Sequence, residues 1–155
     1  MRISFDLDDM LICYQKEVPR ETAKIPLLPL WLDEPLRQGT RSLIADLKQK
    51  GCDVWICTSS SRSPFLIRLW LALHGVWISG RIITQETYTD YLKRFPDSDP
   101  PSKNPRAFGI NLHIDDSEGV KREGEQYGFA VLVIAPDDTE WTQRVSEEVT
   151  RRLKR

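Results

Sequence analysis

The chain has 155 residues, of which 40% are hydrophobic and 29% are charged. These proportions favour one folded domain spanning 1–155 and exclude a disordered or fibrous chain. The formal net charge of −1 gives no general attraction to nucleic acid or to an anionic membrane, so neither partner is indicated.

We expect no export signal and no membrane-spanning helix. Three carboxylates, at Asp6, Asp8 and Asp9, occupy positions where a secretory signal would be apolar. The most apolar stretch, 65–78, contains an arginine and a histidine and is shorter than the ~20 residues of a transmembrane helix. The three cysteines lack metal-ligand spacing and are interpreted as reduced thiols. Together these features predict a cytoplasmic protein.

The first half of the chain predicts two strands and two helices. Gly51 follows the last residue of the first predicted helix, and Pro64 opens the second, which are favoured positions for these residue types. In chain order the predicted elements are a strand at 2–7, a helix at 40–50, a strand at 53–57 and a helix at 64–75.

An irregular insertion or small flap is predicted at 13–39, because four prolines interrupt any regular period there. Within it, the segment 25–32 is strongly apolar and must be covered. The core, a substrate or a second subunit in a homodimer would each cover it, and the sequence leaves these three alternatives open.

The second half of the chain continues to alternate strands and helices. The predicted elements are a strand at 81–84, a helix at 85–95, a loop at 97–105, a strand at 110–114, a helix at 117–127, a strand at 129–134 and a helix from about 138. Alternating elements with apolar strands predict an α/β fold, with a doubly wound, mainly parallel sheet of about five strands.

Polar residues lie at or just beyond the ends of three of the predicted strands, at the sheet edge where parallel α/β folds bind ligands. These residues are Asp6, Asp8, Thr58, Ser59, Asp115 and Asp116, with Lys103 in the loop before the fourth strand. Clustered carboxylates repel one another unless a cation joins them, and hard oxygen ligands favour Mg²⁺. A carboxylate can also attack phosphorus, while a lysine and a hydroxyl bind phosphoryl oxygens. The pattern therefore predicts a magnesium-dependent phosphoryl-transfer site.

Four segments resemble the motifs of the haloacid dehalogenase (HAD) superfamily, in the family's order. FDLDDML at 5–11 is similar to the first motif, an apolar strand ending in Asp-x-Asp, and VWICTS at 54–59 is similar to the second. Lys103 matches the lysine of the third motif, and LHIDDS at 112–117 resembles the fourth. The resemblance covers nearly the whole chain and implies a HAD-like phosphatase with little or no cap domain.

The resemblance implies a role for each matching residue. Asp6 would be the nucleophile that forms an aspartyl-phosphate, and Asp8 the general acid and then the general base. Thr58 and Lys103 would hold the transferring phosphoryl group.

The implied Mg²⁺ site uses the same carboxylates. Asp6, the main-chain carbonyl of Asp8 and Asp116 would bind the ion directly. Asp115 would act through a water molecule or support the other ligands.

Several assignments stay open in the sequence. Lys103 lies only 12 residues before Asp115, which leaves little room for the helix that the family often has between these two motifs. Lys121 is therefore a rival for the lysine role. Arg62, just before a predicted helix, either binds substrate phosphate with Ser59 or is an ordinary surface arginine. His113, inside a predicted strand, is expected to be packed rather than catalytic.

Two functions from different classes remain. The first is a phosphatase acting on a phosphorylated small molecule or macromolecule, which an uncapped site could admit. The alternative is a non-catalytic regulatory or partner-binding protein on the same scaffold. A receiver-type signalling domain is disfavoured, because its acidic pair precedes its phosphorylated aspartate in the chain, which is the reverse of the order here.

Overall fold

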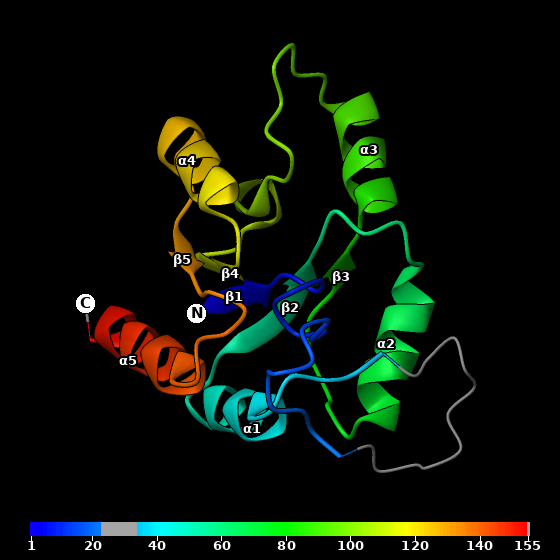
Figure 1. Cartoon of the computed structure of the whole chain (residues 1–155). Coiled ribbons are helices and arrows are strands. Elements are labelled where there is room, and N and C mark those ends of the chain that lie inside the picture. The colour runs from blue at the N-terminus through cyan, green and yellow to red at the C-terminus, as the bar shows by residue number, and fades with distance from the viewer. Residues whose placement is uncertain (23–33, 155) are drawn as a thin grey trace.

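Five parallel strands form a single sheet in the order β3-β2-β1-β4-β5 in a computed structural model that describes residues 1–22 and 34–154 (Figure 1). The strands are β1 (Arg2–Phe5), β2 (Asp53–Cys57), β3 (Ile82–Ile83), β4 (Leu112–Asp115) and β5 (Val131–Val133). β1 pairs with β2 on one side and with β4 on the other, so it lies at the centre of the sheet. The predicted α/β class and parallel sheet are confirmed.

Helices cover both faces of the sheet. They are α1 (Thr40–Gln49), α2 (Pro64–Leu73), α3 (Gln85–Arg94), α4 (Glu118–Tyr127) and α5 (Trp141–Leu153). In Figure 1, α1, α2 and α5 lie on one face of the sheet, and α3 and α4 lie on the other. This is the doubly wound arrangement that the alternating pattern predicts.

The two faces of the central strands carry different residues, because successive side chains of a strand point to opposite sides. Ile3 and Phe5 belong to the large apolar core that also contains residues of α1, α2 and α5. On the other face, Trp55 and Cys57 belong to a smaller buried cluster. Alternation places Ser4 on this second face. The residues that follow β1 lie at the carboxyl edge of the sheet.

Short polar side chains set the beginnings of several helices. The side chain of Ser63 accepts a hydrogen bond from the backbone N–H of Leu66 at the start of α2, and Pro64 is the first helical residue. Thr84 and Ser117 cap α3 and α4 in the same way. These caps agree with the predicted boundaries to within a few residues.

Two predicted boundaries differ from the structure. The last helix begins at Trp141 rather than near Asp138, because the Asp138 carboxylate accepts the backbone N–H of Glu140 at 2.8 Å and holds a turn there. The predicted loop at 97–105 runs into a short 3₁₀ helix, Pro105–Phe108, which the side chain of Asn104 caps.

The two ends of the predicted insertion lie side by side at the end of β1. Isolated bridges pair Ile12 with Leu36 and Arg20 with Arg37, and the N–H of Cys13 donates to the carbonyl of Pro35. The apolar segment 25–32 lies outside the described residues. Among the described helices, none has the length and apolar character needed to cross a membrane.

Candidate functional site

Three carboxylates converge where β1 and β4 end. The backbone N–H of Asp6 donates to the carbonyl of Ile114 at 2.8 Å, which holds Asp6 directly beyond β1. Asp115 ends β4, and Asp116 follows it. One oxygen from each of the three carboxylates lies within 4.8 Å of the other two. The sequence therefore correctly predicted that these residues, from both halves of the chain, come together.

Lys103, in the loop before β4, contacts two of these carboxylates. Its Nζ lies 2.9 Å from Asp6 Oδ1 and 2.8 Å from Asp115 Oδ2, and the residue is only 5% exposed. Burial alone would lower the pKa of the Lys103 ammonium, but the charges of Asp6 and Asp115 outweigh it and hold the pKa above its usual value. Lys103 is thus a buried, charged lysine shared by two carboxylates.

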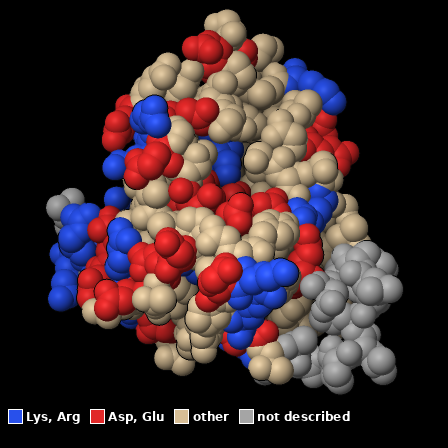
Figure 2. Space-filling view, viewed as in Figure 1, with Lys and Arg blue, Asp and Glu red and all other residues tan. Residues whose placement is uncertain are grey.

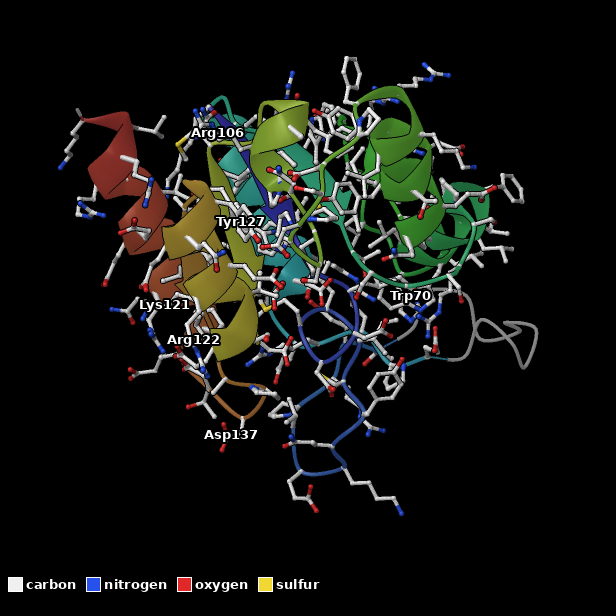
Figure 3. All side chains as sticks on the ribbon, turned by 90° about the horizontal axis from the view of Figure 1, so that it is seen from above. Trp70, Arg106, Lys121, Arg122, Tyr127 and Asp137 are labelled. Atoms are coloured by element: carbon white, nitrogen blue, oxygen red, sulfur yellow. The ribbon has the colours of Figure 1, made fainter. Side chains whose placement is uncertain are left out.

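The rival lysine lies elsewhere. The Lys121 side chain, on α4, is 46% exposed and lies 3.8 Å from the carboxylate of Glu118 on the same helix. Figure 3 shows Lys121 on the outer side of the molecule, well away from Trp70 on α2. Of the two candidates, only Lys103 contacts the carboxylate cluster.

Asp115 has a hydrogen-bond donor on each oxygen. Its Oδ1 accepts the backbone N–H of Ser117 at 2.9 Å, and its Oδ2 accepts from both Lys103 and His113, each at 2.8 Å. Burial alone would raise the pKa of Asp115, but the hydrogen bond from His113 and the charge of Lys103 hold it well below its usual value. Asp115 is therefore ionised and fixed in orientation.

Asp116 has the opposite environment. Burial and the negative charge of Asp115 raise the pKa of Asp116 from its usual 3.8 to about 6, with a smaller contribution from Asp6. A cation held between these carboxylates would relieve that repulsion. The donor set, made of carboxylate oxygens only, fits a hard ion such as Mg²⁺.

The side chain of Asp8 lies outside this cluster. Arg62 Nη1 donates to both of its oxygens, at 2.9 and 3.1 Å, and the Tyr14 hydroxyl donates to Oδ1 at 2.6 Å. The chain turns sharply after Leu7, whose carbonyl accepts two backbone N–H groups, and Asp9 has a positive φ of 56°. A role for the Asp8 carbonyl in metal binding stays a prediction.

Arg62 is held in a network of its own. Its Nη2 forms an ion pair with Glu34. Its Nη1, which donates to Asp8, also donates to Ser60 Oγ at 2.7 Å. Burial alone would lower the pKa of Arg62, but the hydrogen bond to Glu34 and the charge of Asp8 keep it above its usual value. Arg62 is therefore paired with two carboxylates while partly exposed, and binding of substrate phosphate by Arg62 stays a prediction.

The residues after β2 occupy the same edge of the sheet. Thr58 is buried, and its N–H donates to the carbonyl of Ile83 at 2.9 Å, which continues the pairing of β2 with β3. Its Oγ1 accepts the N–H of Ser60 at 3.2 Å. Ser59 is exposed. Both residues follow the end of β2, the strand that pairs with β1, and binding of phosphate by their hydroxyls stays a prediction.

Sequence reasoning missed four contributors to this site. Tyr14 and Glu34 lie at the two ends of the irregular insertion, where no periodicity or spacing singles them out. Ser4 and His113 carried a weak signal, as polar residues inside strands that are otherwise apolar. His113 is fully buried, as expected, but it also contacts Asp115.

The surface reflects this arrangement of charges. Figure 2 shows acidic side chains gathered around a hollow in the middle of one face, with basic atoms at the bottom of the hollow. The region combines a negative rim with buried positive charge, which suits a divalent cation together with an anionic group.

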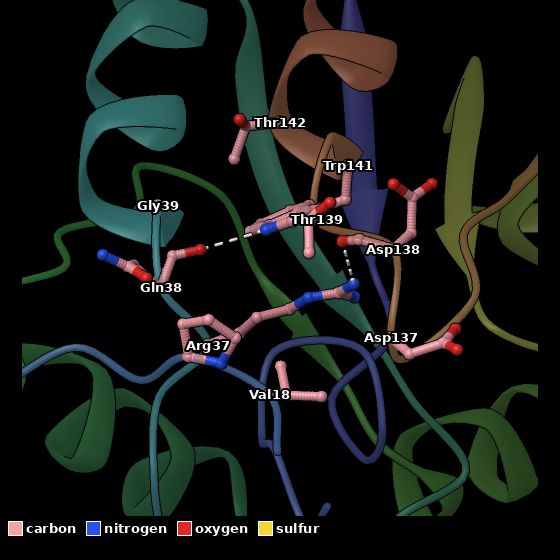
Figure 4. Close-up of a pocket in the computed structure, with 10 residues that line it drawn as sticks. Val18, Arg37, Gln38, Gly39, Asp137, Asp138, Thr139, Trp141 and Thr142 are labelled. Carbon is pink, nitrogen blue, oxygen red and sulfur yellow. Dashed lines mark hydrogen bonds between the residues drawn. The ribbon is translucent and has the colours of Figure 1, made fainter.

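A separate cavity of about 260 Å³ lies between the insertion and the start of α5 (Figure 4). Arg37, which is 1% exposed, lies beneath the Trp141 ring and donates through Nη2 to the carbonyls of Ala135 and Asp138, both at 2.9 Å. The indole N–H of Trp141 donates to the carbonyl of Gln38 at 3.0 Å. These contacts anchor the insertion to α5.

Comparisons of the chain with protein-family models, with curated proteins and with solved structures found no match. The resemblance to the HAD superfamily therefore stays a prediction from the motifs, and function is inferred below from the residues and their geometry.

Proposed function

We propose that this chain is a magnesium-dependent phosphatase, a hydrolase that cleaves a phosphomonoester through an aspartyl-phosphate on Asp6. The convergence of Asp6, Asp115 and Asp116, with oxygens within 4.8 Å of one another, supports this proposal most directly. The buried ammonium of Lys103 lies beside two of these carboxylates. A nucleophile, a cation site and a phosphate-binding cation would then lie within one small volume.

Asp6 and Asp116 would hold the magnesium ion, and Asp115 would support them. When bound, the ion would neutralise the negative charge of the transferring phosphoryl group and of the carboxylates around it. Asp115 is less suited to direct binding, because hydrogen bonds from Ser117, His113 and Lys103 already occupy its oxygens.

In the first half of the reaction, a carboxylate oxygen of Asp6 attacks phosphorus and forms a new P–O bond. The bond from phosphorus to the leaving group breaks, its electron pair goes to the ester oxygen, and that oxygen takes a proton from Asp8. Lys103 and Thr58 donate hydrogen bonds to the phosphoryl oxygens as charge moves in the transition state.

In the second half, a water molecule attacks phosphorus and gives a proton to Asp8. The bond between phosphorus and Asp6 breaks, which releases inorganic phosphate and restores the Asp6 carboxylate. Asp8 is oriented for these proton transfers by Arg62 and Tyr14, which both donate to its oxygens. The oxygen of the leaving group must replace one of these donors.

A non-catalytic, partner-binding protein on the same scaffold is the second candidate. One observation favours it: Arg62 and Tyr14 occupy the side chain of Asp8, outside the carboxylate cluster. A binding protein needs no mobile proton donor, so it could keep these contacts permanently.

The first test is hydrolysis of an aryl phosphate by the purified protein, with and without Mg²⁺. We expect metal-dependent turnover that Asp6→Asn abolishes. Asp90→Asn, which changes an exposed carboxylate paired with Lys93 on α3, should keep full turnover and is the matched control.

Metal binding separates the two candidates if the aryl ester is not turned over. Mg²⁺ should raise the melting temperature of the wild type, and Asp116→Ala should abolish that rise. Absence of both turnover and the metal-induced rise would refute the phosphatase and favour the binding protein.

A further inference from the structure

Two fully buried polar side chains face each other at the centre of the sheet. Ser4 of β1 and His113 of β4 are partners in the strand register, and both are 0% exposed. Ser4 Oγ lies 2.8 Å from His113 Nδ1. This pair occupies one of the least solvent-accessible places in the fold.

The pair continues into the candidate site. His113 Nε2 lies 2.8 Å from Asp115 Oδ2, and the same oxygen accepts from Lys103, which also contacts Asp6. Hydrogen bonds thus run without a break from Ser4 to Asp6 through three intervening side chains.

The hydrogen-bond partners of the two ring nitrogens fix which nitrogen of the His113 imidazole carries the proton. Both oxygens of Asp115 already accept hydrogen bonds, from Lys103 Nζ and from the N–H of Ser117, so Asp115 accepts from His113 as well and His113 Nε2 must carry a proton. Nδ1 is then free to accept from the hydroxyl of Ser4, whose proton has no other acceptor among the described residues. The carboxylate therefore selects the tautomer, and the hydroxyl satisfies the second ring nitrogen and holds the ring in place.

Packing alone does not account for these residues. The neighbours Ile3, Phe5, Leu112 and Ile114 in the same strands are apolar and fully buried. Burying a hydroxyl and an imidazole among them costs free energy unless each polar atom is hydrogen-bonded, and apolar residues would carry no such cost. The polar pair occurs where it can reach a carboxylate of the candidate site.

We propose that His113, oriented by Ser4, is a positioning residue that fixes Asp115 and, through it, the ammonium of Lys103 beside Asp6. His113 touches neither substrate nor metal in this proposal. The catalytic consequence rests on the proposed phosphatase function, whereas the orientation of the imidazole does not.

Loss of the imidazole should weaken the binding of the phosphoryl group, because it displaces Lys103. Without the hydrogen bond from His113, the Asp115 side chain can rotate and take Lys103 with it. Small misplacements of groups that hold a reacting centre are costly, and removal of such supporting partners lowers activity or affinity by about 10- to 100-fold.

The test compares His113→Leu, which removes the donor, with His113→Gln, whose amide can still donate toward Asp115. His74→Gln is the matched control, because His74 is the other buried histidine and its Nδ1 donates only to the Trp70 carbonyl on α2. Binding of inorganic phosphate in the presence of Mg²⁺ is measured by calorimetry, and kcat and KM for the aryl ester are measured in parallel.

We expect His113→Leu to weaken phosphate binding and to lower kcat by about 10- to 100-fold. His113→Gln should recover most of both losses, and His74→Gln should behave as the wild type. A folded His113→Leu protein with wild-type phosphate affinity and kcat would overturn the proposal, as would a failure of His113→Gln to recover either.

Nitrogen NMR of the imidazole gives a readout that needs neither activity nor correct folding of the leucine variant. The wild type should show His113 protonated at Nε2, and Ser4→Ala should leave Nε2 protonated while shifting the Nδ1 signal, because Nδ1 loses the hydroxyl that donates to it. A wild-type ring protonated at Nδ1 alone would overturn the proposal. If the expected tautomer is present while turnover and phosphate binding are both absent, the phosphatase function fails and the orientation of His113 stands.

Discussion

The ammonium of Lys103 lies 2.9 Å from Asp6 Oδ1, although 97 residues separate the two in the sequence. The same nitrogen contacts Asp115, so one buried positive charge serves two buried carboxylates from adjacent strands. This arrangement leaves the cluster with an excess of negative charge near Asp116. It explains why a cation and an anionic phosphoryl group could both be accommodated at the end of β1.

Removal of the shared ammonium should impair both function and stability. Lys103→Met leaves Asp6 and Asp115 buried without their partner, and breaking a buried ion pair in this way costs about 3–5 kcal/mol. We expect a fall of this size in the free energy of unfolding without metal, measured by urea titration, together with loss of turnover.

Lys121→Met is the matched control for this change, because Lys121 is partly exposed and has only a weak contact with Glu118. It should leave both measurements unchanged. Loss of turnover in Lys121→Met, with Lys103→Met still active, would show that Lys121 has the lysine role and that Lys103 does not.

The stability of the metal-free protein should depend on pH through Asp116. Its pKa rises from 3.8 to about 6 on folding, so between these values the folded state binds more protons than the unfolded state. Stability contributed by this group is therefore present below the unfolded pKa and is lost as pH rises through the folded pKa.

Asp116→Asn cannot ionise and should escape this loss. Its melting temperature, relative to the wild type, should increase between about pH 4 and about pH 8 in the absence of metal. The exposed Asp137→Asn should show no such trend. Parallel pH profiles for the wild type and Asp116→Asn would show that Asp116 is not destabilised by its surroundings.

Orientation of Asp8 should depend on Arg62. Arg62→Ala removes the guanidinium that donates to both Asp8 oxygens and should lower kcat by about 10²-fold, which is the lower end of a general acid–base contribution. Arg68→Ala, on α2, removes contacts only to main-chain carbonyls and serves as the control. An unchanged kcat in Arg62→Ala, with a raised KM instead, would indicate that Arg62 binds substrate rather than orienting Asp8.

Anchoring of the insertion should depend on Arg37. Arg37→Met removes the donor to the Asp138 carbonyl and one of the two donors to the Ala135 carbonyl, at a cost of about 0.5–1.5 kcal/mol for each hydrogen bond. We expect a matching fall in the free energy of unfolding, whereas Arg20→Met, at an exposed position in the same insertion, should have little effect. Equal stabilities of the two variants would argue against this anchor.

Much of the fold could be predicted because local signals and the hydrophobic pattern agree. Pro64 begins α2 as expected, and Gly128 has the positive φ of 75° that ends α4. Buried parallel strands are short and apolar, so β1, β2 and β4 were visible as runs. The convergence of Asp6 and Asp115 followed from their residue type and from the expectation that parallel, neighbouring strands end at one edge of the sheet.

Other features depend on tertiary contacts that the sequence does not encode locally. The choice of Lys103 over Lys121 required the path of the loop before β4. The contacts of Tyr14 and Glu34 with Arg62 arise because the two ends of an irregular insertion meet beside α2. The role of His113 required the register of two strands, since Ser4 lies beside it only in the folded sheet.

The most direct test of the proposed mechanism is to look for the covalent intermediate on Asp6. The protein is mixed with an aryl phosphate and Mg²⁺ and quenched in acid within the first turnover, and its peptides are examined by mass spectrometry. We expect a phosphoryl group on the peptide containing Asp6, and none in Asp6→Asn. Metal-dependent hydrolysis that proceeds without any phosphoryl group on Asp6, or with one on a different residue, would contradict the mechanism.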